Sequence, residues 1–246
     1  MGNISEVMAM TSAWIRGREL HKYMACANPH SLVVAGNDSV FKNSLKEADI
    51  LIPDGVGIAL AALILRLPLK KKLAGSDFFL SLSDLAEKNG GLKYFFLGST
   101  DEVLERIQKR LAVDYPHIEI CGIYSPPYKD EFDDHDNAVM IDLINRAKPD
   151  VLWVGMTAPK QEKWIFKNRD RLSVPFTAAI GAVFDFYAGT VKRPSVLLQT
   201  LGLEWLGRFI QEPRRLWRRN FISTPIFLYW VLKEKIHQTF GRSPAC

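Results

Sequence analysis

Hydrophobic and polar positions alternate along this chain in blocks that predict strands followed by helices. Short apolar runs that end at glycine, proline or a small polar residue are typical of buried strands. Segments with apolar residues three or four positions apart predict amphipathic helices. The predicted strands are residues 49–52, 93–97, 118–124, 150–154 and 176–180. The predicted helices are residues 8–23, 58–67, 101–111, 136–147 and 160–170, whereas residues 31–35 fit a short strand or a buried helical turn.

This alternation predicts an α/β fold with a Rossmann-like, mostly parallel sheet flanked by helices. From Pro194 onward the alternation stops, helical periodicity continues, and arginine and tryptophan become frequent. We therefore expect an α/β domain over residues 1–193 and a helical C-terminal appendage over residues 194–246. Ligands of such sheets bind beyond the carboxyl ends of the strands. The loops after the predicted strands are therefore the places to look for chemistry.

Asp54 follows the predicted strand 49–52, between a proline and Gly55. A carboxylate held there by a turn is well placed to act as a general base. The alternative is that Asp54 caps the following helix. Gly55 and Gly57 look like the start of a dinucleotide-binding fingerprint, but Leu60 stands at the third glycine position. The fingerprint G-x-G-x-x-G is therefore absent.

Other loops carry polar residues that fit more than one role. Asn28 precedes a proline and fits a helix N-cap, and Lys72 fits either a solvated loop or a cation beside a phosphate. Lys160 and Gln161 open the helix after strand 150–154, where free N–H groups favour anions. Asp185 follows the last predicted strand and is expected to line the same crevice.

Composition narrows the class of protein. Hydrophobic residues make up 48% and charged residues 24%, as in ordinary globular proteins. Three scattered cysteines argue against a disulfide framework and for a reducing compartment. The N-terminus has no apolar stretch of signal-peptide length, so we expect no export.

The triplet Asp134-His135-Asp136 could suggest a metal–nucleotide site, but it lies in a polar run before a helix, and we expect a helix cap there.

The C-terminal region combines basic and aromatic residues. The formal net charge is +5, and basic residues gather between positions 192 and 219. On a helical path Arg208, Arg215 and Arg218 lie on one side, and their guanidinium groups suit phosphate oxygens. The apolar run 221–232 is shorter than the roughly 20 residues that span a bilayer. It fits a segment lying in an anionic membrane surface, or else a helix packed on the domain with its arginines in water.

Six motifs in this order resemble the WecG/TagA/CpsF family of bacterial glycosyltransferases. They extend over about residues 20 to 220, nearly the whole chain. The motifs are Asn28-Pro29, Pro53-Asp54-Gly55-Val56-Gly57, Gly75-Ser76-Asp77, Ala158-Pro159-Lys160-Gln161-Glu162, Gly181-Ala182-Val183-Phe184-Asp185-Phe186, and the segment from Glu204-Trp205 to Arg219.

The resemblance implies an inverting glycosyltransferase. Such an enzyme moves a sugar, N-acetylmannosamine-like or another hexose, from a UDP-sugar donor to an undecaprenyl-diphosphate-linked sugar. The polyprenyl-diphosphate-linked acceptor belongs to wall teichoic acid, enterobacterial antigen or exopolysaccharide assembly. The resemblance also implies a Rossmann-like core, no metal or other cofactor, and a cytoplasmic protein peripheral on the inner face of the cell membrane. The appendage is expected to reach the membrane and close the site.

The resemblance assigns roles to residues that match the motifs. Asp54 is the expected general base, and Lys72 stands where the family often has an arginine. We predict Asp54, Lys72 and Gln161 as catalytic residues, and no metal site. The predicted substrate-binding residues are Asn28, Gly55, Lys160, Asp185, Arg208, Arg215 and Arg218.

Two other functions are compatible with the spacing of these residues. A nucleic-acid- or phosphate-binding α/β module would use the basic tail, but it gives no role to Asp54 or to Lys160 and Gln161. A nucleotide-sugar hydrolase or epimerase would not need the apolar tail. We therefore expect a UDP-sugar, a lipid-linked acceptor and an anionic membrane surface as partners, and no nucleic acid. A homo-oligomer is compatible with the sequence.

Overall fold

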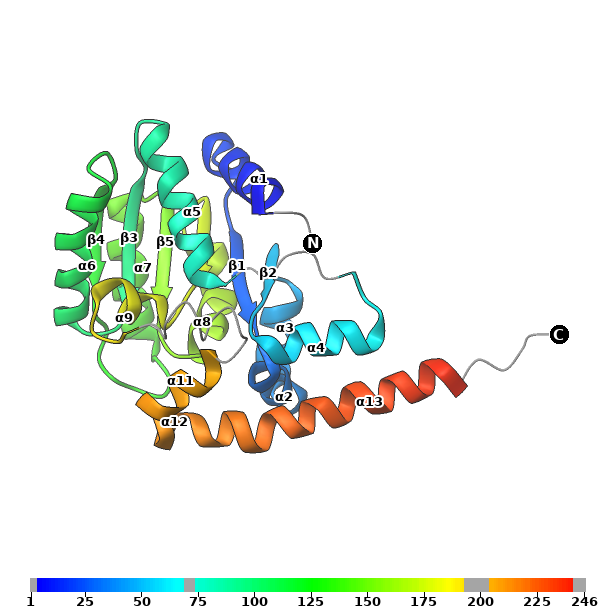
Figure 1. The fold of residues 1–246 in the computed structure, drawn as a ribbon. Coiled ribbons are helices and arrows are strands. Elements are labelled where there is room, and N and C mark those ends of the chain that lie inside the picture. Colours follow the sequence, from blue (N-terminus) through cyan, green and yellow to red (C-terminus); the bar gives the residue numbers. More distant parts are fainter. Residues whose placement is uncertain (1–3, 69–73, 193–203, 241–246) are drawn as a thin grey trace.

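The computed structural model describes residues 4–68, 74–192 and 204–240, and within them six strands form one parallel sheet. The order across the sheet is β2-β1-β6-β5-β3-β4 (Figure 1). This arrangement confirms the predicted α/β class. The strands are β1 (Lys22–Ala27), β2 (Ile50–Pro53), β3 (Lys93–Gly98), β4 (Glu119–Tyr124), β5 (Val151–Gly155) and β6 (Phe176–Ala179).

Helices cover both faces of the sheet. Apolar side chains of α1 (Ile4–Gly17), α5 (Gly75–Lys88), α6 (Asp101–Asp114) and α9 (Val183–Ala188) share a core with one face. Those of α7 (Asp134–Ala147) and α8 (Lys160–Asn168) pack on the other. The remaining helical segments are α2 (Pro29–Asn37), α3 (Ser39–Lys46), α4 (Val56–Leu65), the 3-10 turn η1 (Arg169–Arg171), α11 (Glu204–Gln211), α12 (Pro213–Arg218), the π-helical turn η2 (Arg219–Ser223) and α13 (Thr224–Phe240).

The prediction of one helix over residues 8–23 is wrong at its C-terminal end. The helix stops at Gly17, and Arg18 and His21 have positive φ angles of 49° and 69°. The chain then enters β1, where Tyr23 and Met24 are fully buried. Residues 31–35, which fitted a strand or a helical turn, belong to α2. Periodicity alone cannot distinguish a short apolar strand such as β1 from the end of a neighbouring helix. Residues 22–27 form a strand because they pair with β2 and β6.

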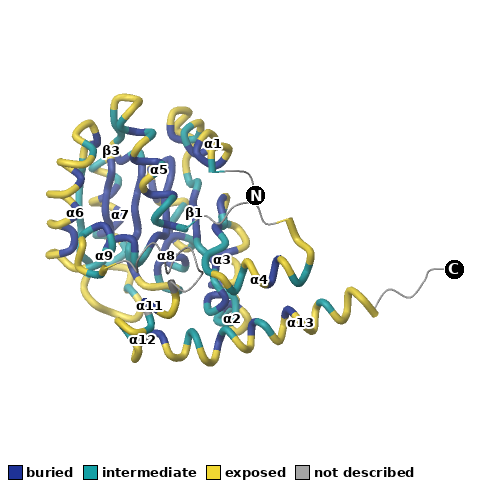
Figure 2. Tube along the Cα trace, in the orientation of Figure 1, coloured by how far each residue is buried: buried dark blue, intermediate teal, exposed yellow. Residues whose placement is uncertain are grey.

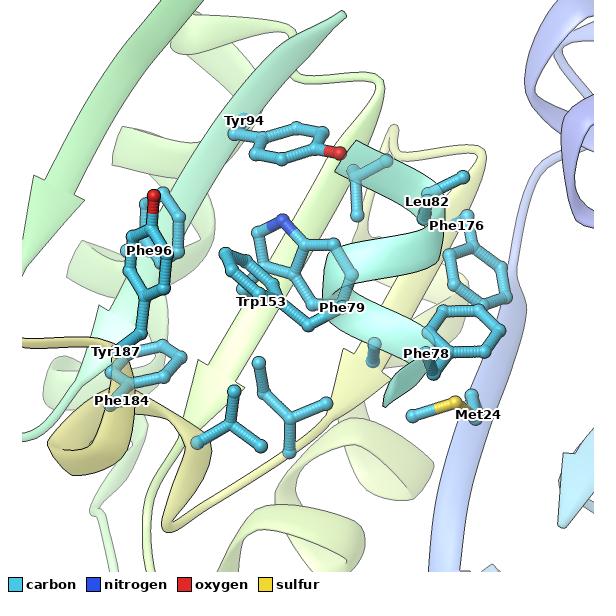
Figure 3. Packing of buried hydrophobic residues seen from close by; sticks show 14 of the residues in the cluster. Met24, Phe78, Phe79, Leu82, Tyr94, Phe96, Trp153, Phe176, Phe184 and Tyr187 are labelled. Carbon is cyan, nitrogen blue, oxygen red and sulfur yellow. The ribbon is translucent and has the colours of Figure 1, made fainter. Parts of the chain in front are cut away.

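An aromatic cluster holds α5 and α9 against the sheet (Figure 3). The ring of Trp153 on β5 lies edge-on to Phe79 of α5, with centroids 4.9 Å apart, and to Tyr94 of β3, at 5.4 Å. Phe184 of α9 extends the cluster by its contact with Phe96 at 5.5 Å. Such pairs add about 0.5–1.5 kcal/mol each beyond area burial. The loops at the carboxyl ends of β5 and β6 therefore rest on a rigid base.

α13 packs on α2 and α4, and η2 packs on α2, at the carboxyl end of the sheet (Figure 1). Phe227 and Val231 of α13 are buried against Ala61 of α4. A Cβ at Gly36 of α2 would lie 2.8 Å from the ring of Trp230, so the indole packs directly on the helix backbone. Much of α13 remains exposed (Figure 2). One side of α13 is thus packed against α2 and α4, and the other side is exposed.

Candidate active site

Loops from distant parts of the sequence meet at the carboxyl edge of the sheet. The backbone N–H of Asp54, after β2, donates to the carbonyl of Ala27 at the end of β1 over 2.7 Å. A Cβ at Gly75, the first residue of α5, would lie 3.4 Å from Sγ of Cys26. The structure therefore brings the ends of β1 and β2 and the start of α5 into one crevice, as expected for a parallel sheet.

Asp54 is half-buried and lines a cavity of about 440 Å³ between the core and the C-terminal helices. The N-cap of α4 is Gly55, and no side chain caps that helix, so the helix-cap interpretation of Asp54 is wrong. Gly55 has φ of 89°, which only glycine adopts readily. The turn therefore presents the carboxylate at the cavity. The lining residues are Pro29, Asp54, Gly55, Val56, Gly57, Leu60, Trp205, Leu216, Arg219, Asn220, Phe221, Thr224 and Leu228.

Gly57 serves close packing of helices. A Cβ there would lie 2.5 Å from Cγ of Pro29, so the first turns of α2 and α4 touch and leave no room for a side chain. Leu60, which replaces the third glycine of the dinucleotide fingerprint, lines the cavity. The glycines of this segment thus shape the turn and the contact of α4 with α2.

Asn28 is the N-cap of α2, as one interpretation of the sequence had it. Its side-chain oxygen accepts from the N–H of Ser31 at 3.0 Å, and Ser31 Oγ accepts from the N–H of Asn28 at 2.7 Å. This capping box fixes the amide at the mouth of the crevice. Since the cap uses the carbonyl oxygen, the amide NH₂ is the group that can turn to a ligand.

Gln161 and Glu162 form a buried polar pair in the first turn of α8. Their side chains are joined by a hydrogen bond of 2.8 Å from Gln161 Nε2 to Glu162 Oε1. Gln161 Oε1 and Glu162 Oε2 are buried and find no hydrogen-bond partner within residues 4–68, 74–192 and 204–240. A Cβ at Gly181, after β6, would lie 3.3 Å from Gln161 Oε1. The pair therefore lies at the junction of β5, β6 and α8.

Burial changes the protonation of two groups in the crevice. It raises the pKa of Glu162 to about 7, although the Gln161 hydrogen bond acts in the opposite direction. Burial also raises the pKa of the Cys26 thiol well above its usual value, and the negative charges of Asp54 and Glu162 add to this effect. Glu162 was not predicted from the sequence. Its place directly after Gln161 in a motif was the available signal, but its burial was not visible.

A second cavity, of about 750 Å³, lies over the loops after β3 and β5. Lys160 lines it, and its ammonium donates to the carbonyl of Lys129 and lies 4.3 Å from the ring centroid of Phe132. Burial lowers the pKa of Lys160. Lys160 therefore holds the loop between β4 and α7 in place beside this cavity. Other lining residues are Gly98, Ser99, Thr100, Tyr128, Gly155, Thr157, Lys163, Lys167 and Arg171.

The other predicted site residues are placed less centrally or not at all. Asp185 accepts a hydrogen bond from Thr190 Oγ1 at 3.4 Å at the end of α9 and lines neither cavity. Arg218 is exposed, with its guanidinium 5.9 Å from the ring of Trp217, whereas Arg219 lines the smaller cavity. The roles of Asp185 and Arg218 stay predictions. Lys72 lies outside the described residues, as do the side chains of Arg208 and Arg215.

The triplet Asp134-His135-Asp136 forms the first turn of α7, whose N-cap is the preceding Asp133. Asp133 accepts from the N–H of Asp136 at 2.8 Å, and Lys129 forms an ion pair of 2.7 Å with Asp136. In the part of the chain that the structure describes, no group of three or more His, Cys, Asp or Glu side chains could hold a metal ion. In the same part, no helix is both long and apolar enough to cross a membrane.

Fold and site define an α/β protein with a carboxylate at the carboxyl edge of a parallel sheet, beneath a layer of C-terminal helices. The family model described as "Glycosyl transferase WecG/TagA/CpsF family" matches residues 2–241, so the chain belongs to this family and is a glycosyltransferase. This confirms the resemblance seen in the six motifs.

Three curated relatives carry the name N-acetylglucosaminyldiphosphoundecaprenol N-acetyl-beta-D-mannosaminyltransferase. The protein of Bacillus spizizenii is 32% identical over 213 residues, which are 87% of this chain and 79% of the relative. That of Bacillus subtilis is 31% identical over 222 residues, 90% of this chain and 83% of the relative. That of Staphylococcus aureus is 28% identical over 213 residues, 87% of this chain and 80% of the relative.

Proposed function

We propose that this enzyme transfers N-acetylmannosamine, or a related hexose, from a UDP-sugar to N-acetylglucosaminyl-diphosphate-polyprenol, with inversion at the anomeric carbon. The names of the relatives support both the sugar and the acceptor. One observation carries the proposal: the carboxylate of Asp54 lines a cavity that the core and the C-terminal helices build together. A site closed by the appendage fits an acceptor that arrives from a membrane surface.

The smaller cavity is the proposed acceptor site because its lining is mixed. Asp54, Arg219 and Asn220 offer groups for a sugar and a diphosphate, and Leu60 and Leu228 offer apolar contact for the first part of a lipid chain. Guanidinium groups suit phosphate oxygens. A lipid-linked sugar diphosphate combines these three chemistries in one molecule.

The larger cavity is the proposed site for the nucleotide part of the donor. It lies where loops after β3 and β5 meet the start of α8, the edge at which parallel sheets bind nucleotides. Lys163 and Lys167 add positive charge to its lining. In the proposed metal-independent reaction, protein cations and N–H groups stabilise the negative charge that gathers on the UDP leaving group. Lys72 stays a candidate for this role from its position in the sequence.

In the proposed mechanism Asp54 removes the proton from the attacking hydroxyl of the acceptor sugar. The hydroxyl oxygen forms a bond to the anomeric carbon as the bond from that carbon to the UDP oxygen breaks. The proton ends on the Asp54 carboxylate and the electron pair on UDP. Because attack comes from the face opposite the leaving group, the anomeric configuration inverts. Asn28, after β1, and Gln161, in the first turn of α8, are the residues that we propose orient the two sugars.

The exposed side of the C-terminal helices supports attachment to an anionic membrane. Tyr229, Leu232 and Ile236 of α13 are exposed, and Leu63 of neighbouring α4 is 76% exposed. Lysines on the same helix, such as Lys233, can attract anionic lipid at about 1 kcal/mol each. We propose that the enzyme lies on the inner face of the cell membrane by this exposed apolar and basic surface.

A panel of UDP-sugars with a short-chain N-acetylglucosaminyl-diphosphate-lipid tests the proposal. We expect transfer from UDP-N-acetylmannosamine and a product with inverted anomeric configuration by NMR. Hydrolysis or epimerisation of the UDP-sugar without transfer to the lipid would refute the proposed function and favour a nucleotide-sugar hydrolase or epimerase.

A further inference from the structure

The side chain of Asn220 has a polar group that no described residue satisfies. Its amide nitrogen Nδ2 is buried and finds no hydrogen-bond partner in the described part of the chain. Asn220 lines the same 440 Å³ cavity as Asp54. Leaving a buried N–H donor unpaired lowers stability, so such groups call for a reason. A ligand that brings an oxygen acceptor into this cavity would supply one.

The backbone that carries Asn220 is unusual and firmly held. Asn220 belongs to the π-helical turn η2. Such turns are rare in proteins, and those that occur are often found at functional sites. His30 Nδ1 and Ser223 Oγ are 2.8 Å apart, and this hydrogen bond ties η2 to α2. The carbonyl of Arg219 accepts the backbone N–H of Thr224 and also its Oγ1, at 3.0 Å, so both groups of Thr224 hold the end of the turn. The turn that carries Asn220 is thus held against α2.

We propose that Asn220 binds the acceptor by donating a hydrogen bond from Nδ2 to an oxygen of its diphosphate. This inference rests on the proposed function. A donor is what a phosphate oxygen requires, whereas Asp54 in the same cavity accepts the proton of the sugar hydroxyl. Arg219, the preceding residue, lines the cavity too and supplies positive charge. The turn between α12 and α13 is thus a substrate-binding element that joins the appendage to the catalytic carboxylate.

The test replaces Asn220 by leucine, which has the same number and branching of side-chain heavy atoms, is bulkier, and has no polar group. In steady-state kinetics Asn220→Leu should raise KM for the short-chain N-acetylglucosaminyl-diphosphate-lipid about 10- to 100-fold, the usual effect of losing a hydrogen bond to a charged group. KM for the UDP-sugar should stay unchanged. The melting temperature should be equal or higher, because an unpaired buried group is removed. Asn220→Asp, which replaces the donor by a negative charge, should raise the acceptor KM further.

Asn43→Leu is the matched control, since Asn43 is exposed on α3 and lines neither cavity. It should leave both KM values unchanged. An unchanged acceptor KM in Asn220→Leu, with normal wild-type transfer, would overturn the inference alone. A lower melting temperature with both KM values raised together would show a structural role and would also overturn it. No transfer by the wild type would refute the proposed function, and with it this inference.

Discussion

Glu162→Gln should make the enzyme more stable at alkaline pH. Glu162 is 1% exposed, and its Oε2 atom is buried with no hydrogen-bond partner among the described residues. Its carboxylate is therefore poorly compensated when it ionises. Glutamine keeps an oxygen that can accept from Gln161 Nε2, has nearly the same shape, and cannot ionise.

The raised pKa fixes the sign and size of this effect. The pKa of Glu162 rises from 4.5 to about 7 on folding, so between these pH values the folded chain binds more protons than the unfolded chain. The free energy of unfolding of the wild type therefore falls as the pH rises through this window. A shift of this size corresponds to about 3 kcal/mol above pH 7, most of which develops between pH 5 and pH 8. The Glu162→Gln variant has no carboxyl at this position, so its free energy of unfolding does not fall for this reason as the pH rises.

Urea denaturation at pH 5, 6, 7 and 8 measures how the free energy of unfolding depends on pH. The difference in unfolding free energy between Glu162→Gln and the wild type should grow by about 2–3 kcal/mol from pH 5 to pH 8 in favour of the variant. Glu105→Gln, on the exposed face of α6, is the matched control and should follow the wild type. If the free energies of unfolding of Glu162→Gln and the wild type change in parallel with pH, ionisation of the buried carboxyl does not destabilise the folded protein, and the reasoning is wrong.

Three further predictions concern metal, membrane and packing. Turnover should survive excess EDTA, and loss of activity restored by magnesium or manganese would contradict the metal-independent mechanism. Serine at Tyr229, Leu232 and Ile236 together should weaken binding to anionic liposomes in sedimentation while sparing turnover on a soluble acceptor; unchanged binding would show that α13 does not meet the membrane. Gly57→Ala should lower stability by about 1–3 kcal/mol, because its Cβ would meet the ring of Pro29; unchanged urea unfolding would contradict that contact.

Much of the fold was predictable because strands between residues 49 and 180 are short apolar runs with clear ends. Strand β1 was missed, because Lys22–Ala27 continues the apolar pattern of α1 and becomes a strand only through its two neighbours in the sheet. The break between α11 and α12 has a local cause, since Pro213 lacks the N–H that would continue the preceding helix and stands first in the new one.

The candidate site was predictable where topology alone determines position. Asn28, Asp54 and Gln161 follow parallel strands, and the carboxyl ends of such strands lie at one edge of the sheet. Glu162 and Asn220 were not predicted, because what distinguishes them is a buried polar atom without a partner. That property depends on residues far apart in the sequence, and no local pattern reveals it.

The most direct test of the account is the kcat of Asp54→Asn on the soluble short-chain acceptor. Asparagine keeps the size of the side chain and the cavity but cannot take the proton from the acceptor hydroxyl. We expect kcat to fall about 10²- to 10⁴-fold, the usual effect of removing a positioned general base, with an unchanged melting temperature. A well-folded Asp54→Asn enzyme with near-normal kcat would contradict the central claim that Asp54 is the base of this glycosyl transfer.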